Sequence, residues 1–122
     1  MFDANFDELL MLQPELRQKY QGFLSTLAES EILPAAVLNV CRITVRQMHG
    51  LEIGSQPKAS NEAEEAAMVI AEKMPFGHHE LQDEHVHQVK EFFGDDGCVA
   101  LLTAVAFFDV ASRLELTFKR EP

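Results

Sequence analysis

The chain has 122 residues, of which 47% are hydrophobic and 25% are charged, a balance typical of one folded globular domain rather than a disordered chain. The 20 acidic residues outnumber the 10 basic ones and give a formal net charge of −10. Because binding to phosphates needs a basic face, this charge argues against nucleic acid and anionic membranes as partners. We predict a single domain over residues 1–122.

The first residues of the sequence favour a cytoplasmic location. Asp3, Asp7 and Glu8 stand where a secretory signal would carry Lys or Arg. The longest apolar run without a charge, residues 97–108, is shorter than the roughly 20 residues that cross a bilayer. We therefore expect a cytoplasmic protein without a membrane segment, in which Cys41 and Cys98 stay reduced.

In chain order, the first helical pattern covers residues 9–27, where apolar side chains recur at steps of three and four. Pro14 suits the first turn of the main helix, because proline lacks an N–H that would be unpaired there. A shorter helical piece is expected before it. The face predicted to point inward consists of Leu9, Leu12, Leu16, Tyr20, Phe23 and Leu27.

A second helix is predicted to begin at Pro34 and to end before Gly50. Its inward stripe consists of Val37, Val40, Cys41, Thr44, Val45 and Met48. Residues 51–60 are the least regular stretch of the chain. They contain Gly54 and Pro57 and are expected to form a loop.

Asn61 and Glu64 have the spacing of a capping box and predict the start of a third helix. This helix is expected to run to about Lys73 and to bury Ala67, Ile70 and Ala71. Pro75 and Gly77 then predict a turn.

Asp83 is predicted to begin a further helix with Val86, Val89 and Phe93 inward, and Gly94 to Asp96 predict a break. The last helix, about residues 95–118, has apolar residues on more than one face, so we expect another subunit to cover part of it. These residues are Val99, Leu102, Val105, Ala106, Phe108, Val110 and Leu114. No strand-like alternation competes, so the predicted fold class is all-α, a bundle of about five or six helices.

Three of these segments resemble the alkylhydroperoxidase D/carboxymuconolactone decarboxylase family. Residues 33–50, LPAAVLNVCRITVRQMHG, are similar to the family helix that leads into the redox motif. Residues 93–118, FGDDGCVALLTAVAFFDVASRLELTF, are similar to its terminal helix, and residues 64–74 are similar to its small-residue helix. The resemblance implies an alkylhydroperoxidase D-like helical bundle and a homo-oligomer, commonly a trimer or a multiple of it.

The redox motif of that family is absent. Peroxidases of the family carry a Glu, a Cys-x-x-Cys pair and a His. In the register of residues 33–50, these positions hold Asn39, Leu51, Gly54 and Lys58. No thiol is left there for a two-cysteine cycle.

The remaining cysteines, Cys41 and Cys98, lie inside apolar helical patterns and are expected to be buried and unreactive. We therefore predict a non-redox family member without thiol peroxidase activity and without a cofactor, which serves small-molecule binding or assembly. A peroxiredoxin-like activity, as in the family at large, stays open as an alternative.

Arg42, Arg46 and His49 share one face of the second helix, and Glu52 follows just beyond it. On one interpretation Arg42 and Arg46 bind a small organic acid while His49 and Glu52 act as catalytic acid and base of a lyase or decarboxylase. On the other, both arginines form structural ion pairs at a helix or subunit contact. Both interpretations stay open from the sequence, and so does the question of whether the chain has any catalytic activity.

His78, His79, His85 and His87 lie close together in the sequence and raise the question of a metal site. On one helix His85 and His87 would point about 200° apart, and the tight ligand spacings of zinc sites are missing. His78 and His79 are expected at a loop, where side chains are usually solvated. We therefore predict no metal site.

Overall fold

The computed structural model describes residues 6–119, and every regular element within them is a helix. The elements are α1 (Phe6–Leu10), α2 (Pro14–Ser30), α3 (Ala35–Met48), α4 (Glu62–Gly77), a short 3₁₀ helix (His78–Glu80) and α5 (Asp83–Lys119). For the described residues this confirms the predicted all-α class of five or six helices.

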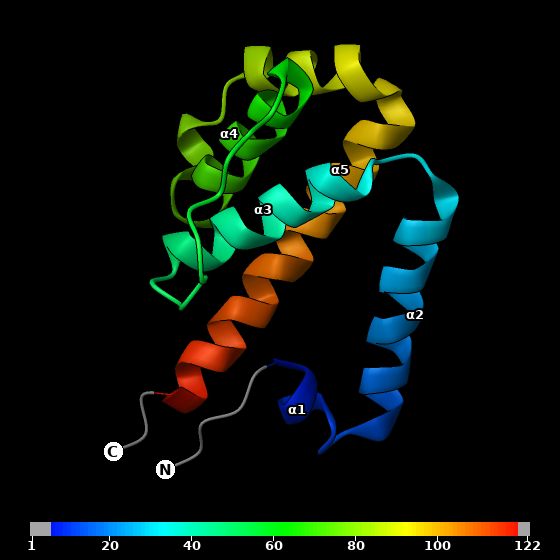
Figure 1. The fold of residues 1–122 in the computed structure, drawn as a ribbon, viewed down its shortest axis with the longest axis vertical. Coiled ribbons are helices and arrows are strands. Elements are labelled where there is room, and N and C mark those ends of the chain that lie inside the picture. The colour runs from blue at the N-terminus through cyan, green and yellow to red at the C-terminus, as the bar shows by residue number, and fades with distance from the viewer. Residues whose placement is uncertain (1–5, 120–122) are drawn as a thin grey trace.

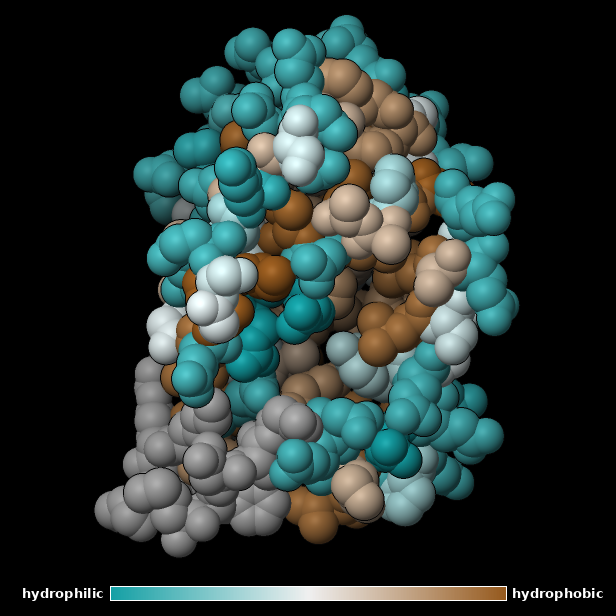
Figure 2. Space-filling view, viewed as in Figure 1, coloured by the Kyte–Doolittle hydropathy of each residue, from teal (hydrophilic) through white to brown (hydrophobic). Residues whose placement is uncertain are grey.

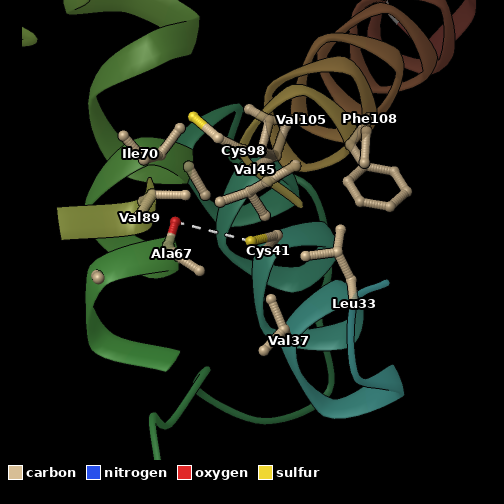
Figure 3. Packing of buried hydrophobic residues seen from close by; sticks show 14 of the residues in the cluster. Leu33, Val37, Cys41, Val45, Ala67, Ile70, Val89, Cys98, Val105 and Phe108 are labelled. Carbon is tan, nitrogen blue, oxygen red and sulfur yellow. Dashed lines mark hydrogen bonds between the residues drawn. The ribbon is translucent and has the colours of Figure 1, made fainter. Parts of the chain in front are cut away.

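Three helices, α3, α4 and α5, pack against one another and contribute most of the core (Figures 1 and 3). The helix α2 lies at the edge of this group and is joined to α1 at one end (Figure 1). It reaches the core through Leu27 and through Phe23, whose ring stacks on that of Phe107 of α5 with the centroids 4.2 Å apart. The buried core includes Leu33, Val37, Cys41, Val45, Ala67, Ile70, Val89, Cys98, Val105 and Phe108. The inward residues predicted for α4, namely Ala67, Ile70 and Ala71, are all fully buried.

The end of α3 follows from Gly50, as predicted. Gly50 has a φ of 76°, and its N–H donates to the Gln47 carbonyl at 2.9 Å while the Leu51 N–H donates to the Arg46 carbonyl at 3.0 Å. This pair of bonds is a Schellman motif. Because Leu51 is buried after the turn, the chain folds back along the last turn of α3, where Arg46 Nη2 donates to the Glu52 carbonyl at 3.3 Å.

The predicted capping box at the start of α4 is confirmed. The Glu64 N–H donates to Asn61 Oδ1 at 2.8 Å, and the Glu64 carboxylate accepts the N–H of Ser60 at 3.0 Å. In the usual box the carboxylate would bind the N–H of the capping residue itself. Here it binds one residue earlier, which also fixes the end of the preceding loop.

The turn predicted at Pro75 and Gly77 is wrong, because α4 continues through both residues. Pro75 lies in the last turn of α4, so its missing N–H removes a single hydrogen bond near the helix end. Its ring is buried, and its carbonyl accepts a hydrogen bond from Arg113 Nη2 at 2.8 Å. Packing against α5 therefore offsets the proline.

The break predicted at Gly94 to Asp96 is present as a kink within α5. Gly94 has a φ of 75° and a ψ of 176°, which is outside the helical region. In Figure 1 the first part of α5 crosses the top of the molecule, and the part after the kink runs down beside α3. The kink thus lets one helix pack against both α4 and α3.

Three positions predicted to point inward, Leu12, Leu16 and Met48, are exposed, so the prediction of their burial was wrong. Leu12, which precedes α2, is 64% exposed, and Leu16 in the first turn of α2 is 58% exposed. Met48 is 40% exposed at the last turn of α3. Val99 and Val110 on α5 are 66% and 58% exposed, and they belong to the helix for which cover by another subunit is expected.

By length and composition alone, residues 83–118 of α5 would suffice to cross a membrane. Of the apolar window in this helix, 39% is already buried against the rest of the chain. The same composition arises in core helices of soluble proteins, so the finding is weak evidence either way. The absence of a membrane segment and the cytoplasmic location therefore stay predictions.

Candidate functional site

A cavity of about 640 Å³ lies between α2, α3 and α5 and has the size of a small-molecule site. In Figure 2 the face seen in Figure 1 is hollowed between α2 and the other helices. The apolar part of the lining consists of Phe6, Leu24, Ile43, Ile53, Phe108 and Ala111. The polar part consists of Asp7, Tyr20, Gln21, Arg42, Arg46, Glu52, Ser112 and Glu115.

Three of the four site residues singled out in the sequence line this cavity. Arg42 and Arg46 reach it because residues four apart lie on one face of α3. Glu52 reaches it because the Schellman turn at Gly50 folds the chain back toward Arg46. His49 is not among the lining residues, since its side chain points toward α5.

Arg46 is paired with Glu115, a buried acid of α5 whose side chain is only 1% exposed. The second carboxylate oxygen of Glu115 accepts the N–H of Phe6 at 3.1 Å. A buried charge needs such partners, so the Arg46–Glu115 pair fixes one wall of the cavity. The sequence reasoning missed Glu115, although an acid within the most apolar helix of the chain is a signal that could have found it.

Arg42, in contrast, has no carboxylate partner among the residues that the structure describes. Its Nη2 donates to Asn39 Oδ1 at 3.2 Å, which leaves the positive charge without an opposite one. The other acid on the α2 side of the cavity, Asp7, is already paired with Arg17 at 3.1 Å. Arg42 is therefore the cation of the lining that remains available to a ligand.

Tyr20 lines the cavity from α2, and nearby charges influence the pKa of its hydroxyl. Burial raises the pKa of the Tyr20 hydroxyl, Arg42 acts in the opposite direction, and Asp7 and Glu115 raise the pKa further. The phenol thus stays protonated at neutral pH and can donate a hydrogen bond to an anion. In the sequence Tyr20 belongs to the predicted inward face of its helix, and no motif there links it to a site.

His49 takes part in a different cluster, where the ends of α3 and α4 meet α5. Its Nε2 lies 2.6 Å from Asp109 Oδ1, and Arg113 Nε donates to Asp109 Oδ2 at 3.1 Å. The Phe76 ring lies against both, with its centroid 4.6 Å from that of His49 and 5.2 Å from the Arg113 guanidinium carbon. Since the His49 side chain is 2% exposed, a substrate has no direct access to it.

Neither cysteine lines the cavity. Cys41 is fully buried and donates its S–H to the Ala67 carbonyl at 3.6 Å, and burial raises its pKa to about 12. Cys98 is 3% exposed, and burial raises its pKa as well. Figure 3 shows the two sulfur atoms apart, with Val45 drawn between them. Both thiols are therefore protonated at neutral pH, the unreactive form.

Two histidines of the 78–87 segment, His85 and His87, have local partners. The Gln82 N–H donates to His85 Nδ1 at 3.0 Å at the start of α5, and His87 lies 3.3 Å from the exposed Glu91. The side chain of His78 lies outside the described part of the structure. Within the described part, no group of three or more His, Cys, Asp or Glu side chains is placed to hold a metal ion.

Comparisons of this chain with known protein families, with curated proteins and with solved structures found no match. Membership of the alkylhydroperoxidase D/carboxymuconolactone decarboxylase family therefore stays a prediction from the resemblance.

Proposed function

We propose that this chain binds a small organic acid in the cavity between α2, α3 and α5 and has no thiol peroxidase activity, as a non-redox relative of the alkylhydroperoxidase D/carboxymuconolactone decarboxylase family. The observation that carries the proposal is the Arg42 guanidinium, which lines the cavity without a carboxylate partner among the described residues. A guanidinium beside an apolar wall suits a carboxylate that carries an apolar chain.

The proposal can be tested with an intrinsic probe. Tyr20 is the single tyrosine of the chain, and the chain has no tryptophan, so tyrosine fluorescence reports on this cavity alone. We expect caproate to change the fluorescence in a saturable way and caproamide, which has the same length without the charge, to bind more weakly. Absence of a saturable response to caproate at millimolar concentration would overturn the proposal.

A pair of variants separates the role of Arg42 from that of net charge. Arg42→Gln should abolish the preference for caproate over caproamide. Lys90→Gln removes the same charge from an exposed position on α5 that does not line the cavity, and should leave the preference intact. Equal losses in the two variants would mean that the ligand responds only to the overall charge of the protein.

A second candidate function is favoured by Glu52, which lines the same cavity as Arg42. In a lyase or decarboxylase acting on a bound organic acid, Glu52 would serve as the acid or base, since His49 is turned toward Asp109. Magnetic resonance spectra of small β-keto acids incubated with the protein would reveal turnover. Turnover that Glu52→Gln abolishes supports this candidate, and unchanged substrate contradicts it.

We also propose that the chain forms a homo-oligomer, a trimer or a multiple of it, in the cytoplasm. Support comes from the apolar side chains of α5 that the single chain leaves exposed, Val99 and Val110. Exposed valines on one helix face favour contact with another protein surface rather than with water.

A further inference from the structure

Two opposite charges in the cavity lining lack a partner among the described residues. Asp7 is paired with Arg17, and Arg46 is paired with Glu115, whereas the Arg42 guanidinium and the Glu52 carboxylate have no opposite charge. Resting on the proposed binding of a small organic acid, we infer that the ligand is a zwitterion, with a carboxylate for Arg42 and an ammonium group for Glu52.

The spacing of the two charges selects among zwitterions. Arg42 and Arg46 are one helical turn apart, a rise of about 6 Å along α3. The Glu52 carbonyl lies 3.3 Å from Arg46 Nη2, so Glu52 sits at the Arg46 end of this wall. An α-amino acid carries its two charges on the same carbon and does not span this separation. An ω-amino acid, whose charges stand at the two ends of a short chain, does.

The wall between the two charges suits the middle of such a ligand. Ile43 and Ile53 line the cavity from α3 and from the segment after it, and Phe108 lines it from α5. Methylene groups of the ligand would pack against these side chains and gain free energy from burial. Since Arg42 and Glu52 are both exposed, each charge contact adds only about threefold to fivefold in affinity.

The test compares three ligands by Tyr20 fluorescence: caproate, ε-aminocaproate and norleucine. Norleucine is an isomer of ε-aminocaproate with the ammonium group next to the carboxylate, so it controls for charge and composition. We expect ε-aminocaproate to bind about threefold to fivefold more tightly than caproate and than norleucine. Glu52→Gln should remove this preference while caproate binds equally well or more tightly, because a nearby negative charge is gone.

The matched control is Glu72→Gln, which removes the same charge from an exposed position of α4 outside the cavity and should keep the preference. Equal affinities for caproate and ε-aminocaproate in the unaltered protein overturn this inference and leave the proposed function standing. A preference that survives in Glu52→Gln also overturns it. Absence of caproate binding overturns the proposed function itself.

Discussion

The imidazole of His49 and the carboxylate of Asp109 meet at 2.6 Å where the end of α3 crosses α5. Asp109 is held from its other side by Arg113, which in turn donates to the Pro75 carbonyl of α4. The pair therefore joins the ends of α3 and α4 to α5. His49, which the sequence suggests as a catalytic residue, therefore makes a structural contact between helices.

We predict that His49→Ala lowers the free energy of unfolding by about 2–4 kcal/mol, because it leaves a cavity and removes a buried partner of Asp109. Caproate affinity should change less than twofold, since His49 does not line the cavity. Urea unfolding followed by circular dichroism and a Tyr20 titration measure the two quantities. His49→Gln, which retains hydrogen bonding, serves if the alanine variant does not fold. Loss of caproate binding in a folded variant would place His49 in the site after all.

The sequence predicted most of the cavity's α3 wall and little of the rest, for a physical reason. The positions of Arg42, Arg46 and Glu52 depend on helical spacing and on the Gly50 turn, which are local. Glu115 enters the site because α5 packs against α3, and Tyr20 enters it because α2 contacts Phe107 of α5, and no local pattern encodes either contact. His49 has the right spacing, but it is the capping residue with φ −90° and ψ 0°, and α5 passes beside it.

For the fold, helix ends were predictable where a side chain or a glycine determines them, as at Gly50, Asn61 and Gly94. Periodicity also identified which side of each helix is apolar. It does not say whether anything covers that side, and Leu16 of α2 is exposed for this reason. Pro75 predicts a turn because proline is locally unfavourable in a helix, whereas its contact with Arg113 is a property of the folded chain.

Burial of Cys41 leads to a pH prediction. Its pKa is raised from 9.0 to about 12 in the folded chain, so folding favours the protonated thiol. This contribution is complete below pH 9 and is lost as the pH rises toward 12, because the unfolded chain then releases a proton that the folded chain retains. The loss of stability caused by Cys41→Ala, measured against the unaltered protein at the same pH, should therefore be smaller at about pH 10.5 than at about pH 8.

Urea unfolding at both pH values, under reducing conditions, provides the comparison. A difference that does not depend on pH would mean that the Cys41 thiol ionises as readily in the folded chain as in the unfolded chain.

The burial of both thiols also predicts that any hydroperoxide consumption is unchanged in the double variant Cys41→Ser, Cys98→Ser. A rate that vanishes in that variant would restore the peroxiredoxin-like alternative.

Gly94 provides a prediction about the kink in α5. At its φ of 75° an L-residue with a Cβ is strained, and no other atom lies within 4 Å of the place a Cβ would take. Gly94→Ala should therefore cost about 1–2 kcal/mol through backbone strain alone. Gly22→Ala is the matched control, because Gly22 lies inside α2 with similar free space, and there alanine should stabilise by about 0.5–1 kcal/mol. Equal changes in the free energy of unfolding for the two variants would contradict the strained backbone at Gly94.

The exposed valines of α5 give a prediction about assembly. Val99 and Val110 are eleven residues apart, which is close to three helical turns, so they lie on one face of the helix. Their burial in an oligomer would gain roughly 25 cal/mol for each Å² of apolar surface removed from water. The double variant Val99→Glu, Val110→Glu should reduce the mass measured by light scattering to that of one chain. Because both side chains are exposed, the fold of the single chain should persist, as circular dichroism would show.

The control for added charge is Gln18→Glu with Gln88→Glu, two exposed positions on α2 and on the first part of α5. It changes the net charge by the same amount and should leave the assembly intact. An assembly that survives in the valine variant would move the contact to another surface, with the exposed Leu12 and Leu16 beside α2 as the next apolar candidates. A protein that is monomeric before any substitution would remove the proposed oligomer and leave the ligand proposals untouched, since all the cavity residues on which they rest belong to one chain.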